Sequence, residues 1–175
     1  CHLFKNLKRL YLGDNNISDK GIKELPSADF AGNLSLLDVR YNNIGPEGGL
    51  AVVKSEKFRK LQVLIFQENP VGDETLITLA KAPAFANLRK LNFYRTDITP
   101  KGIKVLAKSK VLQRVKQLNL ARNYLHLESA RLLGNTKTLT NIEILLLFDT
   151  GIGDAGVKAI MESEAFSKLK TLRVT

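Results

Sequence analysis

The chain has 175 residues, of which 44% are hydrophobic and 25% charged, and its formal net charge is +10. This composition is ordinary for a folded chain, and no apolar run approaches the roughly 18 residues of a membrane-spanning helix. Its one cysteine, Cys1, excludes an internal disulfide framework. Its two histidines, His2 and His126, are too few and too far apart to indicate a metal site, so we expect no metal and no cofactor.

A period of 27 residues runs through the whole chain without insertion or deletion. Every unit reads apolar-x-x-apolar-x-apolar-x-x-Asn/Thr-x-apolar, as in Leu7, Leu10, Leu12, Asn15 and Ile17 of the first unit. A fixed period of this length is typical of solenoids. We therefore treat residues 1–175 as a single domain of six repeats and a partial seventh, which start at Leu7, Leu34, Leu61, Leu88, Val115, Ile142 and Leu169.

In chain order, each repeat predicts a short strand, a buried Asn or Thr, and then a helix. The first repeat places Phe30 one residue earlier than the later repeats place their closing apolar residue, so its helix should end differently. In the fourth repeat the strand lies at 88–93, and Thr99 and Pro100 then begin the helix as its N-cap and first residue. In the fifth, His126 precedes the helix as a solvated residue, and in the sixth the strand lies at 142–148.

These units resemble the ribonuclease-inhibitor-like class of leucine-rich repeats. The segments Lys81–Leu88 and Ser163–Leu169 resemble the 27-residue bacterial form of that class. The resemblance implies a right-handed α/β solenoid, shaped like a horseshoe, with a parallel sheet on the concave side and helices on the convex side. It also implies a protein-binding scaffold, and it includes secreted bacterial effectors. Recurring glycines early in the helices indicate close packing, which we expect against the strand layer.

Candidate binding residues occupy the outward-facing positions of the strands, which we expect to be exposed to solvent. These positions vary between repeats while the core positions do not, as on a recognition surface. Tyr and Arg are enriched where binding energy concentrates, and an exposed apolar patch can mark an interaction site. On this basis the predicted partner-binding residues are Tyr11, Arg40, Tyr41, Tyr94, Arg95, Arg122, Leu146 and Phe148.

The charge is concentrated in two repeats. The fourth contains eight basic residues and one acidic residue, and the fifth four and one, so together they carry the net charge of the chain. Three interpretations remain open: a solvated convex surface, an acidic protein partner, or electrostatic binding of nucleic acid or an anionic membrane. Nucleic acid is the less favoured partner, because no array of aromatic residues lies among the basic ones.

Catalysis is not indicated, because no histidine is placed to serve a serine as a base and the carboxylates are scattered. The prediction is therefore a scaffold that binds a protein, with an electrostatic binder or a structural spacer as alternatives. The scarcity of cysteine favours a reducing compartment, including a host cytoplasm after secretion. Because neither end shows a polar capping repeat, we expect a piece of a longer array. The oligomeric state is not predicted.

Overall fold

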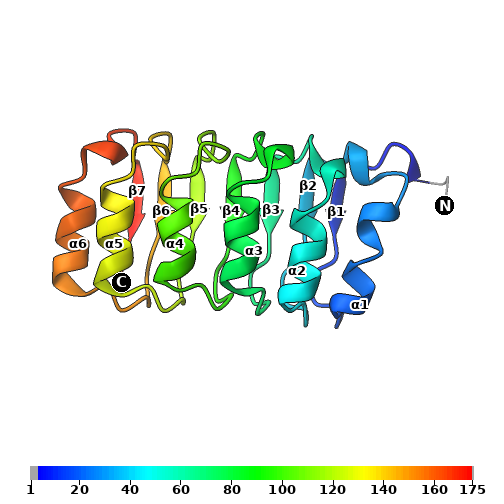
Figure 1. The fold of residues 1–175 in the computed structure, drawn as a ribbon, viewed down its shortest axis with the longest axis horizontal. Helices are drawn as coiled ribbons and strands as arrows, with labels where there is room; N and C mark the ends of the chain where they lie inside the picture. Colours follow the sequence, from blue (N-terminus) through cyan, green and yellow to red (C-terminus); the bar gives the residue numbers. More distant parts are fainter. Residues whose placement is uncertain (1–3, 175) are drawn as a thin grey trace.

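The computed structural model describes residues 4–174, which form one row of strands and helices (Figure 1). Within these residues seven parallel strands make a single sheet in sequence order. The strands are β1 (Arg9–Tyr11), β2 (Leu36–Asp38), β3 (Val63–Ile65), β4 (Lys90–Asn92), β5 (Gln117–Asn119), β6 (Ile144–Leu146) and β7 (Thr171–Arg173). Cys1 and His2, discussed above, lie outside the described residues.

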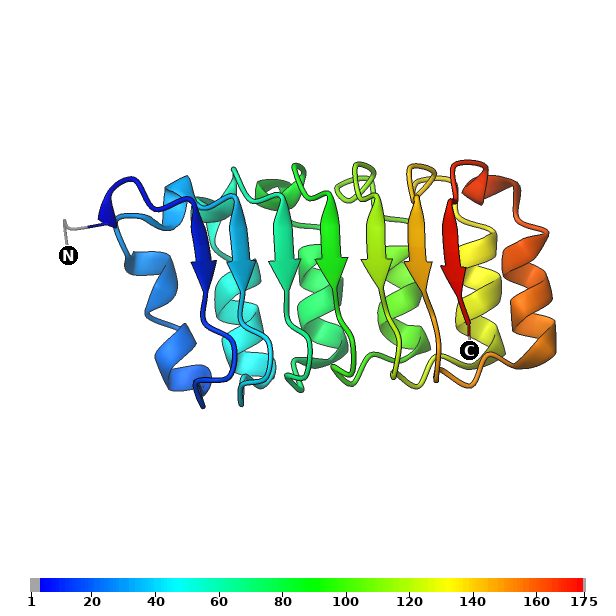
Figure 2. The same ribbon diagram turned by 180° about the vertical axis from the view of Figure 1, so that it is seen from behind.

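The helices all lie on one side of the sheet, and we call the opposite side of the sheet the strand face. They are α1 (Asp19–Ile22), α2 (Pro46–Val53), α3 (Gly72–Leu79), α4 (Pro100–Leu106), α5 (His126–Gly134) and α6 (Gly153–Met161). Among the described residues, five short 3₁₀ turns lead back to the strands: η2 (Leu25–Ser27), η3 (Ala31–Asn33), η4 (Glu56–Phe58), η5 (Pro83–Phe85) and η6 (Glu164–Phe166). The row of helices extends further than the row of strands (Figure 2), so the strand face is the inner side of the stack.

The sequence period sets the register of the sheet. Each strand residue pairs with the residue 27 positions later, as Arg9 pairs with Leu36 and Leu36 with Val63. Residues at equivalent positions of successive repeats therefore stack on one another, and the stacked leucines form a continuous core. Phe66 lies 5.5 Å from Phe93 between ring centroids, and Phe58 lies 6.2 Å from Phe85. All four of these rings are fully buried, which makes the repeat-to-repeat contacts the main source of stability.

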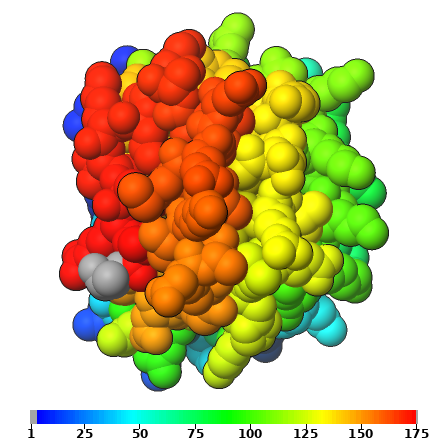
Figure 3. Space-filling view, turned by 90° about the vertical axis from the view of Figure 1, so that its left-hand side faces the viewer, coloured from blue at the N-terminus to red at the C-terminus, as the bar shows by residue number. Residues whose placement is uncertain are grey.

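The first repeat departs from the others as predicted. Its helix α1 has only four residues, and two 3₁₀ turns, η2 and η3, replace the rest of a normal helix. The opposite end of the row shows α6 and β7 side by side at the surface (Figure 3). Core residues of both end repeats, such as Leu10 and Leu172, are only partly buried, because each has a neighbouring repeat on one side among the described residues.

The Asn/Thr column forms a ladder inside the stack. Asn123 Oδ1 accepts hydrogen bonds from the backbone N–H groups of Thr96 (3.1 Å) and Ile98 (2.9 Å) in the preceding repeat. Its Nδ2 donates to the carbonyls of Phe93 (2.6 Å) and Leu120 (2.9 Å). This confirms that the column satisfies backbone groups where the chain leaves the strand, as buried polar groups require.

The helix glycines are packed closely, but not as predicted. A Cβ on Gly48 would lie 2.4 Å from Asp19 Oδ1, and one on Gly102 would lie 2.5 Å from Asp73 Oδ1. The prediction of packing against the strand layer is wrong for these two positions, because their nearest neighbour is the first helical turn of the preceding repeat. The glycines make room for a carboxylate that reaches across from that turn.

Candidate binding surface

The strand face brings together side chains from repeats that are far apart in sequence. Tyr94 follows β4 and Phe148 follows β6, and their ring centroids are 5.9 Å apart. Ala121 follows the intervening strand β5 in the same column and is fully buried. The small side chain of Ala121 allows the two rings to meet above it, and the rings explain why it is inaccessible.

Two arginines complete this group. Arg122 Cζ lies 5.7 Å from the centroid of the Tyr94 ring, and Arg173 Cζ lies 4.6 Å from that of Phe148. Arg122 Nε also lies 3.2 Å from Asp149 Oδ2. We call Tyr94, Phe148, Arg122 and Arg173 the aromatic–arginine cluster. Cation–π contacts of this kind stabilise an arrangement by about 0.5–1 kcal/mol at exposed sites, so the four side chains hold one another in place.

The cluster continues into the apolar strand β6. Leu146 is half-buried, as are Phe148 and Ile144. Four side chains that the sequence predicts as partner-binding residues, Tyr94, Arg122, Leu146 and Phe148, thus lie in the same region of the strand face. Arg173 is not among the residues predicted from the sequence, although its position follows from the repeat: it pairs with Leu146 in the sheet and occupies the column of Tyr11.

The other predicted binding residues lie along the remainder of the strand face or pair with neighbours. Arg40 Nε donates to both oxygens of Asp38 at 2.9 and 2.8 Å, and this hydrogen bonding raises the pKa of Arg40. Arg95 Nη1 lies 3.0 Å from Glu68 Oε2. Tyr41 Oη accepts a hydrogen bond from Gln67 Nε2 at 2.9 Å. Tyr11, on the first strand, is 60% exposed.

The expectation that all outward-facing strand positions are exposed is wrong for four of them. Their side chains are covered by their neighbours: Arg40 binds the carboxylate of Asp38, and Gln67 Oε1 accepts a hydrogen bond from Asn92 Nδ2 at 3.0 Å. Long side chains on the inner surface reach the neighbouring strands. The alternation of inward and outward positions along a single strand does not predict these contacts. The buried outward positions are Asp38, Ile65, Asn92 and Ala121.

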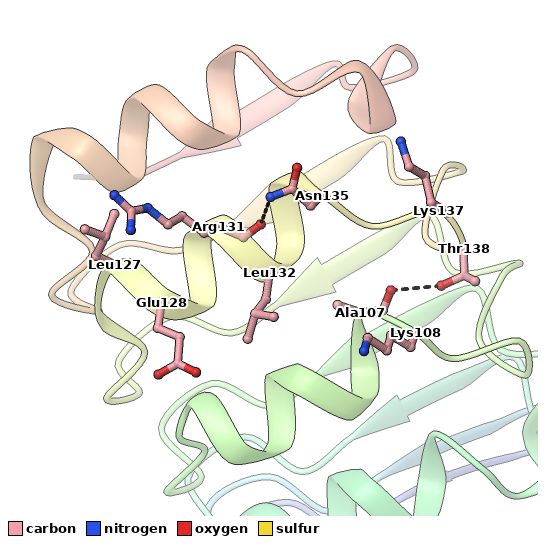
Figure 4. A pocket seen from close by; sticks show the side chains of 9 residues that line it. All are labelled: Ala107, Lys108, Leu127, Glu128, Arg131, Leu132, Asn135, Lys137 and Thr138. Atoms are coloured by element: carbon pink, nitrogen blue, oxygen red, sulfur yellow. Dashed lines mark hydrogen bonds between the residues drawn. The ribbon is translucent and has the colours of Figure 1, made fainter.

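The helix face contains a groove that was not predicted from the sequence. It lies between α4 and α5, has a volume of about 630 Å³, and presents Leu127 and Leu132 beside the charged side chains of Lys108, Glu128 and Arg131 (Figure 4). Asn135 Nδ2 donates to the Arg131 carbonyl at 2.9 Å, and Thr138 Oγ1 donates to the Ala107 carbonyl at 3.1 Å. With Lys137, three cationic side chains and one carboxylate line this groove, so its charge is predominantly positive.

Comparison with known proteins agrees with this geometry. A family model described as "Leucine Rich repeat" matches residues 5–25, 33–53 and 138–161. Each segment contains the strand and the helix of one repeat: the first, the second and the sixth. The fold is an α/β leucine-rich-repeat solenoid. No enzyme family matches. Leucine-rich-repeat folds are typically non-catalytic and are in general protein-binding scaffolds.

Solved structures include a similar chain, titled "Plant peptide hormone receptor RGFR1 in complex with RGF2". The match has 15% sequence identity and a TM-score of 0.49, and it covers 98% of this chain. This chain spans 28% of the length of that receptor chain. A search of curated proteins found no match. Within residues 4–174, no helix has the length and hydrophobicity to cross a membrane.

Proposed function

We propose that this leucine-rich-repeat domain binds a protein partner on its strand face, with the aromatic–arginine cluster as the centre of the contact. The observation that supports this most directly is the pairing of Tyr94 with Phe148 across a buried alanine, with an arginine against each ring. Tyr and Arg side chains concentrate binding energy in protein interfaces. Half-buried aromatic rings that are already fixed lose little conformational entropy when a partner covers them.

The partner should present both apolar and acidic groups. Apolar side chains would pack on Phe148 and Leu146, and a carboxylate would approach Arg122 or Arg173. A partner carboxylate near Arg122 would compete with Asp149, which already lies 3.2 Å from its Nε. We therefore expect apolar contacts to contribute most of the affinity, and the arginines to orient the partner.

We also propose a class of leucine-rich repeat, a cellular compartment and a biological role for this protein. The 27-residue units, with an α-helix in each of the first six repeats, support a ribonuclease-inhibitor-like class. The single cysteine supports work in a reducing compartment. Use as a secreted effector that meets a host protein rests on the sequence resemblance, and it makes host cytosol the first source of partners to try.

The test is quantitative affinity capture with three immobilised proteins. The natural chain is compared with Tyr94→Ala/Phe148→Ala and with Tyr124→Ala, which removes a ring that is 70% exposed in a loop outside the cluster. We expect one defined protein to be retained by the natural chain and by Tyr124→Ala, and to be depleted at least about tenfold by the double variant, since loss of a central contact costs about 2 kcal/mol.

Purified partner and each variant should then be compared by calorimetry, with thermal unfolding measured in parallel. Unchanged unfolding of Tyr94→Ala/Phe148→Ala together with lost binding would support a recognition role. If all three proteins retain the same partners to the same extent, the aromatic–arginine cluster is not the binding centre.

A further inference from the structure

The net charge of this protein lies along one edge of the sheet. All seven strands run in the same direction, so their amino ends line a single edge, at the top in Figure 2. Consider the five residues centred on the first apolar residue of each repeat (5–9, 32–36, 59–63, 86–90, 113–117, 140–144 and 167–171). They contain eleven Lys and Arg residues and one carboxylate, Glu143. The rest of the chain has 16 basic and 16 acidic residues, by subtraction from the 27 and 17 of the whole.

We call this row the basic edge. All eleven of its cationic residues are exposed, whereas Glu143 is partly buried between two of them. Lys116 Nζ and Lys170 Nζ lie 2.6 and 2.7 Å from the two oxygens of Glu143. The side chains of Lys8, Arg89 and Lys90 make no hydrogen bond or ion pair with any part of the chain that the structure describes. The edge therefore offers uncompensated positive charge.

Some of these cations are held in position by asparagines of the preceding repeat. Lys60 Nζ donates to Asn33 Oδ1 at 3.0 Å, and the same arrangement recurs 54 residues later, where Arg114 Nη1 donates to Asn87 Oδ1 at 3.0 Å. Each asparagine is itself anchored, because Asn33 Nδ2 donates to the Lys5 carbonyl at 2.9 Å. A neutral amide fixes the side chain without cancelling its charge, which keeps the cation available for a ligand.

A hollow of about 580 Å³ lies on the same edge. It is lined by Lys5, Lys8 and Lys60 together with four carboxamide side chains and one serine, and it contains no carboxylate. Ammonium and amide N–H groups are the donors that bind phosphate oxygens. This hollow is thus suited to a single oxyanion group, and it continues the row of charge toward the first repeat.

We propose that the basic edge binds the phosphate backbone of a nucleic-acid duplex, without reading its sequence. Strands repeat every ~4.8 Å, so seven of them present their eleven cations over about 29 Å. One strand of a duplex carries a phosphate about every 3.4 Å, or roughly 8 to 9 over that length. An extended acidic peptide presents one carboxylate per ~6.7 Å on one face, which is too sparse to match this density.

The lack of aromatic side chains at the basic edge decides between forms of nucleic acid. None of the seven five-residue segments contains Phe, Tyr or Trp. Proteins that bind single strands combine a basic groove with aromatic rings on which the bases stack. A duplex keeps its bases stacked internally and exposes its phosphates, so it needs only the donors that this edge supplies. This surface is distinct from the aromatic–arginine cluster. Duplex binding at the basic edge is therefore independent of protein binding at the cluster.

The experiment is fluorescence anisotropy with labelled duplexes of about 20 base pairs and unrelated sequences, at ~0.05 to ~0.3 M salt. The natural chain is compared with the edge variant Arg89→Glu/Lys90→Glu and with Lys104→Glu/Lys108→Glu. The second pair belongs to the same repeat, changes the charge equally, and lies on the exposed helix side. We expect the edge variant to weaken binding at least about tenfold and to reduce the salt slope by about 2. The helix-side control should change it less than about twofold.

Three further arms make the outcome decisive. Arg89→Gln/Lys90→Gln should also weaken binding, which covers the case in which charge reversal unfolds the protein. Tyr94→Ala/Phe148→Ala should bind the duplex normally. Two other polyanions, phosphatidylserine vesicles and free poly-glutamate, should each bind more weakly than the duplex at equal salt. Equal weakening by the edge and helix-side pairs, tighter binding to the vesicles or to poly-glutamate, or no duplex binding at ~0.1 M salt would overturn the proposal.

Discussion

At the scale of single residues, the Asn/Thr column determines how each loop enters its helix. Where the next repeat supplies asparagine, its Oδ1 accepts backbone N–H groups of the loop, and Asn123 accepts two from the fourth repeat. The helix then begins after an extended residue such as Thr99. Where the next repeat supplies threonine, the loop turns back on the Thr96 or Thr150 carbonyl instead. A short hydroxyl cannot reach both N–H groups, so the loop must change its conformation.

His126 lies in one of these altered loops, and it predicts a stabilising substitution. The first helical residue there is left-handed: φ is +54° at His126, whereas glycine occupies the equivalent positions, Gly72 (+70°) and Gly153 (+63°). A left-handed backbone costs a side-chain-bearing residue about 1–2 kcal/mol relative to glycine. We expect His126→Gly to raise the free energy of unfolding by about 1 kcal/mol, measured by urea denaturation.

A matched control tests the same conformation in reverse. Gly153→Ala places a Cβ in open space, since no heavy atom lies within 4 Å of it. Its effect is therefore purely conformational, and it should destabilise the protein by a similar amount. If His126→Gly is neutral or destabilising while Gly153→Ala is costly, the imidazole makes a contribution that its geometry does not explain.

At the scale of elements, the starts of α2 and α4 are each capped by a carboxylate of the preceding repeat. Asp73 in α3 accepts from the N–H groups of Thr99 (2.9 Å) and Gly102 (3.1 Å) and from the Thr99 hydroxyl (2.6 Å) at the start of α4. Asp19 does the same for α2 through Gly45 N–H at 2.6 Å. These two carboxylates thus cap the helix of the following repeat, because stacking brings the first turns together.

This contact predicts a coupled pair of substitutions. Asp73→Ala should lower the free energy of unfolding by about 1–2 kcal/mol, as for a lost helix cap. The exposed side chain of Asp154 makes no hydrogen bond or ion pair with the described residues, so Asp154→Ala should have a much smaller effect. Gly102→Ala should destabilise the natural protein by crowding Asp73. In the Asp73→Ala background it should cost less, and equal costs in the two backgrounds would contradict the proposed contact.

At the scale of the whole molecule, Glu143 links three repeats and predicts a pH dependence. Hydrogen bonds from Lys116 and Lys170 lower its pKa to about 2. The unfolded value is about 4.3, so its stabilising contribution is complete above that pH and is lost as the pH falls toward 2. Urea unfolding midpoints should therefore decline more steeply over this window in the natural protein than in Glu143→Gln. Glu128→Gln, which removes an exposed carboxylate on the helix side, should retain the natural profile.

The sequence by itself determined the repeat, the strand order and the core, because a fixed 27-residue period aligns every column with itself. Leu61, Leu88 and Ile142 are buried for that reason alone. Tyr94 and Arg122 could be selected as candidates because they vary at outward positions, although their binding role stays a prediction. Arg173 was missed because it falls in an incomplete repeat.

Only the tertiary structure determined which side chains of different columns contact one another and which of them are buried. The contact of Tyr94 with Phe148 spans two repeats and depends on the size of Ala121, and the burial of Asp38 depends on the rotamer of Arg40. The sequence also placed the positive charge in the fourth and fifth repeats, whereas the folded chain collects it along the amino ends of the strands. Parallel stacking turns positions 27 residues apart into neighbours, so cations that are scattered along the chain gather along one edge of the sheet.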